Sequence, residues 1–305
     1  MRLIITGGLG HIGTGILEKT ANFKMFKEII VIDNHASIKI NFLINLRFNI
    51  PVRIIDADIN DLNLKKIFKK DDVIIHLAAI TNATESFKIK KNIFLNNFSI
   101  TKKIVDISNK LNLRCIFFSS TSVYGSNDKI MYEDDVTNLN PQSPYAECKI
   151  KEENYITKYS KKFVIFRLGT IFGVSRGIRF HTAVNKFCLQ SATNKPLTIW
   201  KTAMYQKRPY LDINDAIRCF SFIIKNNLFF NETLNVVSVN LSLHELILIL
   251  KKYKKIKIKL VSSKIMNQLS YIASNKKIKN YGFKFNGNLH TQIKKTINLF
   301  KGNLL

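Results

Sequence analysis

The stretch that decides the fold is Leu3-Ile4-Ile5-Thr6-Gly7-Gly8-Leu9-Gly10-His11-Ile12-Gly13, near the start of a chain of 305 residues. Its first four residues form an apolar run that predicts a buried strand, and the residues after Gly13 predict a helix that reaches about Asn22. A second apolar run, over 28–32, leads to Asp33, which lies twenty residues beyond Gly13. A G-x-x-G-x-x-G turn that follows a strand, opens a helix and has an acidic residue at that distance predicts a dinucleotide site.

Each part of this motif has a physical role in holding a dinucleotide. The three glycines permit a tight turn, close approach of the pyrophosphate and close packing of the helix, whose first N–H groups would face the phosphates. The residues expected to contact the cofactor at this turn are Gly7, Gly10, His11, Ile12 and Gly13. Asp33, with Asn34 beside it, would accept hydrogen bonds from the adenosine ribose hydroxyls. Because a carboxylate there would repel a 2′-phosphate, we expect NAD rather than NADP.

Strand and helix patterns then alternate through the first half of the chain. Apolar runs over 52–55, 72–79 and 114–118 predict three more strands, and the periodicity over 92–111 predicts a long helix. This alternation predicts an α/β fold, a doubly wound parallel sheet of Rossmann type, with ligands at the carboxyl ends of its strands. Residues that follow such ends and are expected to contact the cofactor are Asp58, Ile59, Leu77, Ala78 and Ala79. Asp58 could equally cap a helix over 60–68, and the two roles are compatible.

Composition limits the class of protein. The hydrophobic content of 46% is ordinary for a globular protein, no apolar run approaches the roughly 18 residues of a membrane helix, and no signal segment precedes the first strand. We therefore expect a cytoplasmic protein without a membrane partner. The four cysteines are widely spaced and lack metal-ligand spacing, which predicts reduced, mostly buried thiols and no metal site.

The net charge of +27 has two interpretations. A positive field attracts polyanions, and nucleic acids and anionic membranes are among them. However, the lysines are scattered through every segment, without an arginine-rich tract or a basic-aromatic module. A general lean toward lysine is therefore favoured, and a nucleic-acid partner is not expected. A basic surface would still attract a negatively charged sugar nucleotide.

A second stretch, Pro144-Tyr145-Ala146-Glu147-Cys148-Lys149, carries the candidate chemistry. If it opens a helix, Tyr145 and Lys149 lie four residues apart on one face. An ammonium beside a phenol favours the phenolate and lowers its pKa from about 10. That effect would make Tyr145 a general base near neutral pH.

Several motifs, taken in order, resemble one family. They are the glycine turn, Asp33, Asp58, His76-Leu77-Ala78-Ala79, Ser119-Ser120-Thr121-Ser122-Val123-Tyr124-Gly125 and Tyr145-x-x-x-Lys149. The chain resembles an extended short-chain dehydrogenase/reductase of the NAD-dependent epimerase/dehydratase family, and most of all the UDP-glucose 4-epimerase type. The resemblance covers nearly the whole length, because 166–173, 207–216 and 274–283 also resemble segments of the family.

The resemblance implies a role for individual residues. Tyr145 would be the catalytic base, Lys149 would hold the nicotinamide ribose, and Ser120 would hydrogen-bond the reacting sugar hydroxyl. Asn97 would be a helix position close to the cofactor and the active site. The residues implied to contact a nucleotide-diphosphate sugar are Ser120, Thr121, Thr170, Arg179 and Arg208. Thr170 departs from the family, where many members carry an Asn that touches the substrate phosphate.

The activity implied is that of an NAD-dependent nucleotide-sugar epimerase of polysaccharide biosynthesis, which oxidises sugar C4 transiently by hydride transfer to NAD. Dehydratases of the family carry an Asp-Glu pair directly after the position of Ser120, and decarboxylases carry a Glu at the position of Ser122. This chain has Thr121 and Ser122 there, which disfavours both activities. A 4-dehydrogenase or 4-ketoreductase that releases its product would have the same residues. A non-catalytic NAD- or RNA-binding protein on the scaffold is disfavoured by the intact Ser120, Tyr145 and Lys149.

The predicted organisation has two domains. The NAD-binding domain would comprise 1–172 and 209–238, and a smaller α/β nucleotide-sugar-binding domain would comprise 173–208 and 239–305. The resemblance also implies a homodimer, formed through the helix at 93–111 and the helix after Tyr145.

Overall fold

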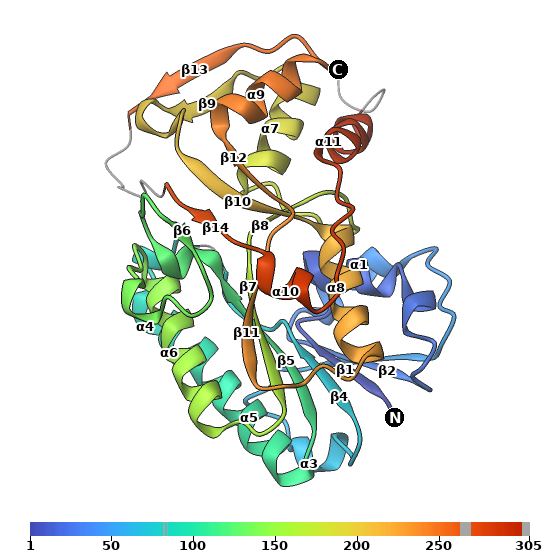
Figure 1. Cartoon of the computed structure of the whole chain (residues 1–305). Helices are drawn as coiled ribbons and strands as arrows, with labels where there is room; N and C mark the ends of the chain where they lie inside the picture. Colours follow the sequence, from blue (N-terminus) through green and yellow to red (C-terminus); the bar gives the residue numbers. More distant parts are fainter. Residues whose placement is uncertain (82, 84, 263–269, 301–305) are drawn as a thin grey trace.

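Seven parallel strands form the main sheet of the computed structural model, which describes residues 1–81, 83, 85–262 and 270–300 (Figure 1). Their order across the sheet is β11-β7-β5-β4-β1-β2-β3. These strands are β1 (Leu3–Thr6), β2 (Ile29–Asp33), β3 (Val52–Asp56), β4 (Val73–His76), β5 (Arg114–Ser120), β7 (Phe163–Leu168) and β11 (Glu232–Val236). The order reverses between β1 and β4, so the ends of these two strands form the crevice in which such sheets bind ligands.

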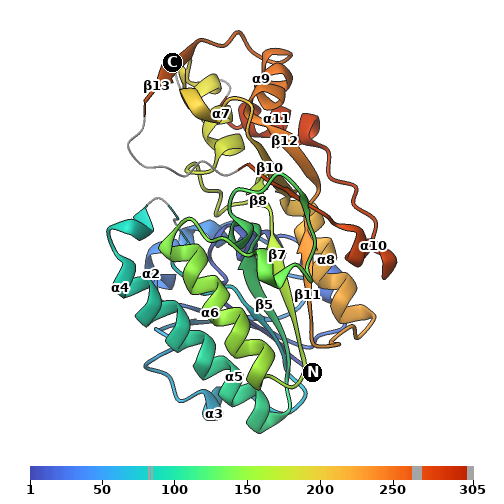
Figure 2. The same cartoon turned by 60° about the vertical axis from the view of Figure 1, so that its left-hand side comes forward.

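The main sheet is covered by helices on both faces. Helices α1 (His11–Leu17) and α8 (Ile213–Lys225) lie on one face, and α3 (Leu64–Ile67), α5 (Ser99–Leu111) and α6 (Pro144–Tyr159) lie on the other (Figures 1 and 2). Strands β1, β2 and β4 are therefore buried along their whole length, as their continuous apolar runs predict. The predicted doubly wound fold is confirmed.

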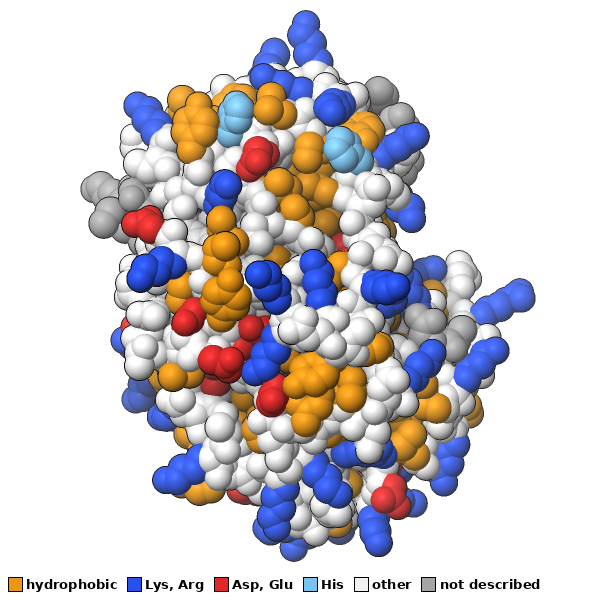
Figure 3. Space-filling view, viewed as in Figure 1, with side chains coloured by type: hydrophobic (Ala, Val, Ile, Leu, Met, Phe, Trp, Pro, Cys, Tyr) orange, Lys and Arg blue, Asp and Glu red, His pale blue; other side chains and the backbone are white. Residues whose placement is uncertain are grey.

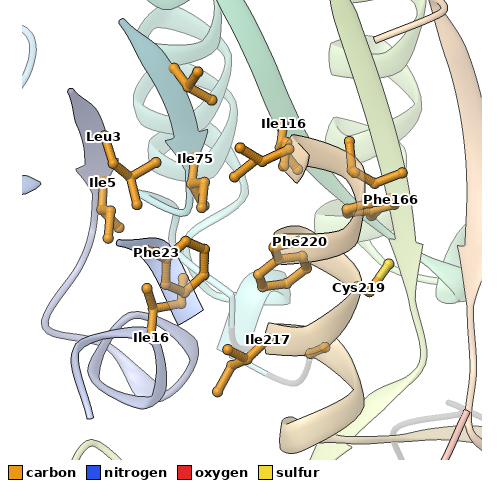
Figure 4. Close-up of a cluster of buried hydrophobic side chains, with 14 of the residues drawn as sticks. Leu3, Ile5, Ile16, Phe23, Ile75, Ile116, Phe166, Ile217, Cys219 and Phe220 are labelled. Carbon is orange, nitrogen blue, oxygen red and sulfur yellow. The ribbon is translucent and has the colours of Figure 1, made fainter. Parts of the chain in front are cut away.

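The core beneath α1 and α8 fixes these helices on the sheet. Leu3, Ile5, Ile75, Ile116 and Phe166 project from the strands toward Ile16, Phe23, Ile217 and Phe220 (Figure 4). The ring centroids of Phe166 and Phe220 lie 5.6 Å apart in a stacked arrangement. This packing holds α1, and with it the glycine turn, at the end of β1.

The rest of the chain forms smaller sheets with a separate core. Strands β8 (Thr170–Phe172), β10 (Lys207–Asp212) and β12 (Val239–Ser242) form one sheet, and β9 (Leu197–Trp200) pairs with β13 (Ile258–Val261). Helices α7 (Ala183–Ala192), α9 (Leu243–Lys251) and α11 (Leu289–Asn298) surround a core that includes Phe172, Phe187 and Leu246. Strand β14 (Ile272–Ala273) pairs with β6 (Ile130–Met131), and the remaining α-helices are α2 (Ala36–Lys39), α4 (Lys90–Ile93) and α10 (Lys276–Asn280). The domain boundaries at 172, 208 and 238 stay predictions.

Three predicted helices differ in detail from the structure. The helix expected to reach about Asn22 ends at Leu17, and a 3₁₀ turn at Thr20–Phe23 follows it. The helix expected over 92–111 consists of α4, a π-helical turn at Phe94–Phe98 and α5. The helix expected over 60–68 comprises only Leu64–Ile67, with Asn63 at its N-cap. Asp58 is therefore not a helix cap: its carboxylate accepts the N–H of Asn60 at 2.8 Å in the preceding turn.

The surface charge and the burial of the cysteines agree with the predictions made from composition. Lys and Arg side chains are spread from end to end of the face shown in Figure 3, as a general lean toward lysine predicts. Cys115, Cys148, Cys188 and Cys219 are all buried as free thiols, which confirms that prediction. Of the helices in the described part of the chain, none has the length and apolarity needed to cross a bilayer.

Candidate active site

The glycine turn packs directly against the end of β4. Thr6 lies opposite both Ile32 and His76 in the register of the sheet, so the strands beside β1 end level with it. Gly7 has a φ of 65°, and a Cβ there would lie 2.7 Å from the Ala78 Cα and N atoms. This approach requires glycine, because side chains rarely adopt that φ and the space is filled by backbone. The predicted turn residues and 77–79 are thus brought together.

Asp33 lies at the opposite side of the same turn. Its carboxylate accepts the Leu9 N–H at 3.0 Å and the His35 N–H at 3.1 Å, and forms an ion pair with Lys39 at 3.0 Å. The side chain of Asn34 donates to Asp58 at 3.2 Å, which brings these two predicted cofactor contacts together. The side chain of Ile59 is buried in the core, which leaves its backbone for the predicted contact.

These residues fit a dinucleotide. The backbone at Gly10 is extended, and the atoms nearest to a Cβ built there are the Gly7 O at 3.4 Å and the Arg179 Nη2 at 3.5 Å. The turn itself carries no side chain at Gly10, and it lies beside the Asp33 carboxylate, an acceptor of the kind that ribose hydroxyls need. The turn and Asp33 provide the shape and the acceptor that the adenosine diphosphate half of NAD requires.

Two buried polar side chains hold the end of β4. His76 contacts the Thr6 hydroxyl through Nδ1 at 2.7 Å, and burial together with the Lys149 ammonium lowers its pKa to about 3. Asn97 accepts the Ile80 N–H at 2.8 Å and donates to the Ile80 carbonyl at 3.0 Å. The Asn97 amide is thus used within the protein, where it positions the chain after Ala78 and Ala79.

Helix α6 presents Tyr145 and Lys149 as the spacing predicts. Ser143 caps the helix by accepting the Ala146 N–H at 3.2 Å, and Pro144 occupies its first turn. The Lys149 Nζ lies 5.8 Å from the centroid of the Tyr145 ring. Lys149 is buried, whereas Tyr145 is half-buried.

The electrostatics around Tyr145 correct one expectation. Burial raises the pKa of Tyr145 above its ordinary value; the Lys149 and Arg179 charges oppose this shift, and Glu152 adds to it. The contribution of Lys149 has the predicted sign, but the prediction of a net lowering is wrong because desolvation of the phenolate is the larger effect. Burial lowers the pKa of Lys149, but Glu152 and Tyr145 outweigh it and raise the pKa above its ordinary value, so the ammonium stays charged.

Ser120 ends β5, against which α6 packs. Its Oγ accepts hydrogen bonds from the Ser122 N–H at 3.2 Å and from the Ser122 Oγ at 2.9 Å. Thr121 is buried, and its hydroxyl contacts the Leu168 carbonyl at 3.2 Å and the Tyr271 hydroxyl at 3.1 Å. The Thr121 hydroxyl is thus hydrogen-bonded within the protein, and its contact with substrate stays a prediction.

A loop at 173–179 fastens the second part of the chain onto α1. The His11 ring contacts the Gly173 carbonyl at 2.9 Å, and burial lowers the pKa of His11 to about 4. Ser175 donates to the His11 carbonyl at 2.8 Å, and the Gly177 N–H donates to the Thr14 hydroxyl at 2.9 Å. The loop brings Arg179 above Gly10, where its guanidinium donates to Thr81 at 2.6 Å.

The other two predicted substrate residues lie on neighbouring strands. Thr170 on β8 is opposite Tyr210 on β10, two residues after Arg208. Burial raises the pKa of Tyr271 to about 12, and the hydrogen bond with Thr121 and the nearby Arg208 charge oppose that shift. The Arg208 charge therefore acts on Tyr271, which contacts Thr121.

Sequence reasoning did not predict three side-chain contacts of this site. Glu152, Ser122 and Tyr271 contact Lys149, Ser120 and Thr121, respectively. The spacing of Glu152 from Lys149 on one helix was a usable signal, but Tyr271 is 150 residues from Thr121 and gave none. No group of three or more His, Cys, Asp or Glu side chains able to hold a metal occurs among the described residues.

Comparison of the sequence with known families and proteins gives consistent matches. Residues 3–236 match the profile of the NAD dependent epimerase/dehydratase family. A dTDP-D-glucose 4,6-dehydratase of Dictyostelium discoideum is 30% identical over 249 residues, which are 73% of this chain and 55% of that protein. The chain thus spans about half the length of that relative. A Bacillus subtilis (strain 168) protein described as an uncharacterized UDP-glucose epimerase, YtcB, is 27% identical over 247 residues, or 77% of this chain and 76% of that protein.

Solved structures share the fold over the whole chain. UDP-glucuronic acid 4-epimerase from Bacillus cereus, in complex with UDP-glucuronic acid and NAD, has a TM-score of 0.85 at 24% identity, with 99% of both chains covered. Thermus thermophilus UDP-glucose 4-epimerase in complex with NAD has a TM-score of 0.79 at 20% identity, with 100% of both chains covered. The matched family is NAD-dependent, which agrees with the cofactor predicted from Asp33 and the glycine turn.

Proposed function

The chain belongs to the NAD-dependent epimerase/dehydratase family, and from that premise we propose that it is a nucleotide-sugar 4-epimerase. One observation carries the proposal. Tyr145 and the Lys149 ammonium, 5.8 Å from the centre of the phenol ring, lie on a helix packed against the strand that ends at Ser120. This arrangement supplies a base, a cation and a hydroxyl donor at the carboxyl end of the sheet, beside the glycine turn.

Residues at the edge of the main sheet would hold NAD, and two arginines from later segments would hold the substrate. Gly7, Gly10 and Asp33 would hold the pyrophosphate and ribose of NAD, whose nicotinamide accepts the hydrogen of sugar C4 when bound. Arg179, next to Gly10, and Arg208, whose charge acts on Tyr271, carry guanidinium groups, which suit the oxygens of a substrate diphosphate.

The proton chemistry belongs to Tyr145 and Ser120. Tyr145 takes the proton of the sugar C4 hydroxyl in its phenolate form, which burial disfavours and the Lys149 and Arg179 charges favour. The Ser120 Oγ accepts two hydrogen bonds from Ser122, so its own O–H is left to donate to the developing C4 carbonyl oxygen. After the keto sugar turns over in the site, Tyr145 returns the proton to the same oxygen.

A panel of nucleotide sugars tests the proposal. The purified protein is incubated with UDP-, dTDP-, GDP- and ADP-hexoses, and the products are separated and weighed while the absorbance of reduced nicotinamide is followed. We expect an isomer of unchanged mass with no build-up of reduced cofactor. A product lighter by two hydrogens would replace the epimerase by a 4-dehydrogenase, and a product lighter by one water would identify a dehydratase.

Replacing the base gives the sharper test. Tyr145→Phe removes the proton acceptor, so turnover should fall by about 10² to 10⁴-fold while the dissociation constant for NAD changes little. Tyr159→Phe is the matched control, because Tyr159 ends the same helix and is 47% exposed. Turnover that survives in Tyr145→Phe would refute the assignment of the base.

We also propose a homodimer through the face formed by α4, α5 and α6, which lie side by side (Figure 2). Phe87 and Leu95, next to and within this face, are 47% and 61% exposed and would supply apolar surface to such a contact. Light scattering after size exclusion should give twice the chain mass, and Leu95→Lys should give the monomer.

A further inference from the structure

Glu152 is a buried carboxylate on the helix that carries Tyr145. Its Oε2 accepts a hydrogen bond from the Lys149 Nζ at 2.8 Å, and the two side chains are 5% and 6% exposed. Its Oε1 accepts a weaker hydrogen bond from the Cys148 thiol at 3.4 Å. Burial of a carboxylate is costly unless it is paired, so the pairing with Lys149 is what permits Glu152 at this position.

The neighbouring residue shows that this pair is not a general feature of the helix. Glu153 is also buried, but its carboxylate binds the Arg167 guanidinium at 2.7 Å on the side of Tyr124, away from Lys149. Among the described residues, Glu152 is the only acidic side chain within ion-pair distance of Lys149. Two adjacent glutamates thus make buried ion pairs, and only one of these pairs involves the active-site cation.

We propose that Glu152 is a positioning residue, which holds the Lys149 ammonium in place and limits how strongly its charge favours the Tyr145 phenolate. This inference rests on the proposed function, in which Tyr145 is the base. A lysine side chain has four rotatable bonds, so an ion pair at 2.8 Å restricts where its ammonium can go. One N–H is directed at Glu152, and the other two remain for the ligand side of the crevice.

Electrostatics gives the second half of the argument. A lone ammonium close to a phenol favours the phenolate, but a carboxylate 2.8 Å from that ammonium turns the single charge into a short dipole. The field at Tyr145 is therefore weaker than Lys149 alone would produce. Consistent with this, burial raises the pKa of Tyr145, Lys149 opposes the shift, and Glu152 reinforces it.

The other charges near the site act differently. Arg179, from the loop at 173–179, opposes the rise in the pKa of Tyr145, and the Cys148 thiol on α6 adds to it. His76, from β4, is neutral above its pKa of about 3, because burial and Lys149 disfavour its charged form. Arg179 and the neutral His76 offer no negative charge to the Lys149 ammonium, and the Cys148 thiol donates to Glu152.

Other charged groups on α4, α5 and α6 make contacts away from Lys149. Lys90 of α4 pairs with the half-exposed Glu147 at 3.0 Å, and the Lys151 ammonium lies 4.3 Å from the centroid of the Phe98 ring of the π-helical turn. At the far end of the helix, the Tyr155 hydroxyl contacts Asp106 of α5 at 3.4 Å. Glu152 is accordingly the carboxylate best placed to change the ionisation of Tyr145.

The test compares two matched glutamine variants. Glu152→Gln keeps the size of the side chain and an oxygen that can accept from Lys149, but it removes the negative charge. Ionisation of Tyr145 is followed without substrate by ultraviolet absorbance, as the difference between each protein and the same protein carrying Tyr145→Phe. We expect the pKa of Tyr145 to be about one unit lower in Glu152→Gln than in the wild type. Glu153→Gln, which removes the neighbouring buried charge, should leave that pKa unchanged.

Turnover gives an independent measurement. With a substrate from the nucleotide-sugar panel, the acid limb of the pH profile of kcat/KM should shift to lower pH in Glu152→Gln, by as much as the pKa of Tyr145 falls. The profile of Glu153→Gln should not shift. Glu152→Asp retains the charge but shortens the reach to Lys149. It should keep the pKa of Tyr145 near the wild-type value while turnover falls several-fold, and this variant also serves if Glu152→Gln does not fold.

The outcomes separate the inference from the proposed function. An unchanged or raised pKa of Tyr145 in Glu152→Gln, with Tyr145→Phe inactive, would overturn the role of Glu152 and leave the base intact. A lowered pKa of Tyr145 in Glu152→Gln would support the inference whatever the activity of Tyr145→Phe. If Tyr145→Phe still turns over substrate, the base has been assigned wrongly. An equal shift in Glu153→Gln would overturn the inference, because any buried charge on the helix would then have the same effect.

Discussion

Alanine substitutions at Gly13 and Gly10 should distinguish a glycine required for stability from a glycine required only for NAD binding. A Cβ at Gly13 would lie 2.3 Å from the Gly8 carbonyl oxygen and 2.5 Å from the Gly8 C and Cα atoms. All three are backbone atoms of the turn, so no side chain can rotate away to make room. Contacts of a Cβ below about 3.0 Å are essentially not tolerated, so Gly13→Ala must separate the helix and the turn by roughly 0.7 Å.

The size of the effect follows from that displacement. Overpacking of a close-packed site costs about 1–3 kcal/mol, and the better helix propensity of alanine returns at most about 1 kcal/mol. We expect Gly13→Ala to lose roughly 1–2 kcal/mol of unfolding free energy. Affinity for NAD should fall as well, because N–H groups of a displaced turn lose hydrogen bonds worth about 1–3 kcal/mol each to a charged phosphate, a factor of roughly ten to one hundred.

Gly10→Ala is the matched comparison. Its Cβ would meet the Gly7 carbonyl oxygen at 3.4 Å and the Arg179 Nη2 at 3.5 Å, both ordinary contacts, and the φ of −81° and ψ of −176° suit any residue. The unfolding free energy should stay within about 0.5 kcal/mol of the wild type. The methyl group would nevertheless occupy the space that the pyrophosphate approaches, so the dissociation constant for NAD should rise by about tenfold or more.

Urea unfolding followed by far-ultraviolet circular dichroism gives the stabilities, and isothermal titration calorimetry gives the NAD affinities. The decisive pattern is a stable but weakly binding Gly10→Ala beside a destabilised and weakly binding Gly13→Ala. Wild-type affinity in Gly10→Ala would refute the placement of the pyrophosphate. Equal destabilisation of both variants would refute the geometric argument.

Two further predictions follow from buried or paired charges. The pKa of His76 is about 3 in the folded protein against an ordinary value of 6.5, so the stability present above pH 6.5 is lost on acidification. His76→Gln should shrink the loss of unfolding free energy between pH 7 and pH 5 by about 2 kcal/mol, while the exposed His35→Gln should not; equal shifts of the urea midpoint in both variants would contradict this. Lys39 forms an ion pair with Asp33 at 3.0 Å and so weakens the repulsion of a 2′-phosphate. Lys39→Gln should raise the preference for NAD over NADP by about fivefold in titration calorimetry, and an unchanged ratio would contradict that role.

The architecture of the main sheet was accessible from sequence because its signals are local. A strand buried on both faces reads as a continuous apolar run, as at Leu3–Thr6 and Ile29–Asp33, and a glycine turn marks where the first one ends. Parallel strands that end level with one another bring residues such as Ala78 and Asp33 to a single edge without any further information. The position of Tyr145 and Lys149 on one helix face is local in the same sense.

The pairing of side chains within the site was less accessible. The π-helical turn at Phe94–Phe98 coincides with the hydrogen bonds between Asn97 and Ile80, seventeen residues apart, and no helical period encodes such a contact. The net pKa shift of Tyr145 is a difference between burial and opposing charges. The sequence reveals the lysine but not the depth of burial, which is a property of the packed molecule.

The surroundings of Ser120 bear on which reaction the site can support. Thr121 is only 2% exposed and its hydroxyl contacts the Leu168 carbonyl and the Tyr271 hydroxyl, so a carboxylate there would face a carbonyl oxygen without solvent. An acidic side chain there would need the Tyr271 region to repack before its protonated carboxyl group could donate a proton to a leaving hydroxyl. A longer acidic side chain at Ser122 would likewise disturb the hydrogen bonds that the Ser120 Oγ accepts. Thr121 and Ser122, the two residues after Ser120, are thus engaged within the protein and neither is acidic, which agrees with the proposed epimerisation, in which Tyr145 would exchange a proton with one sugar oxygen.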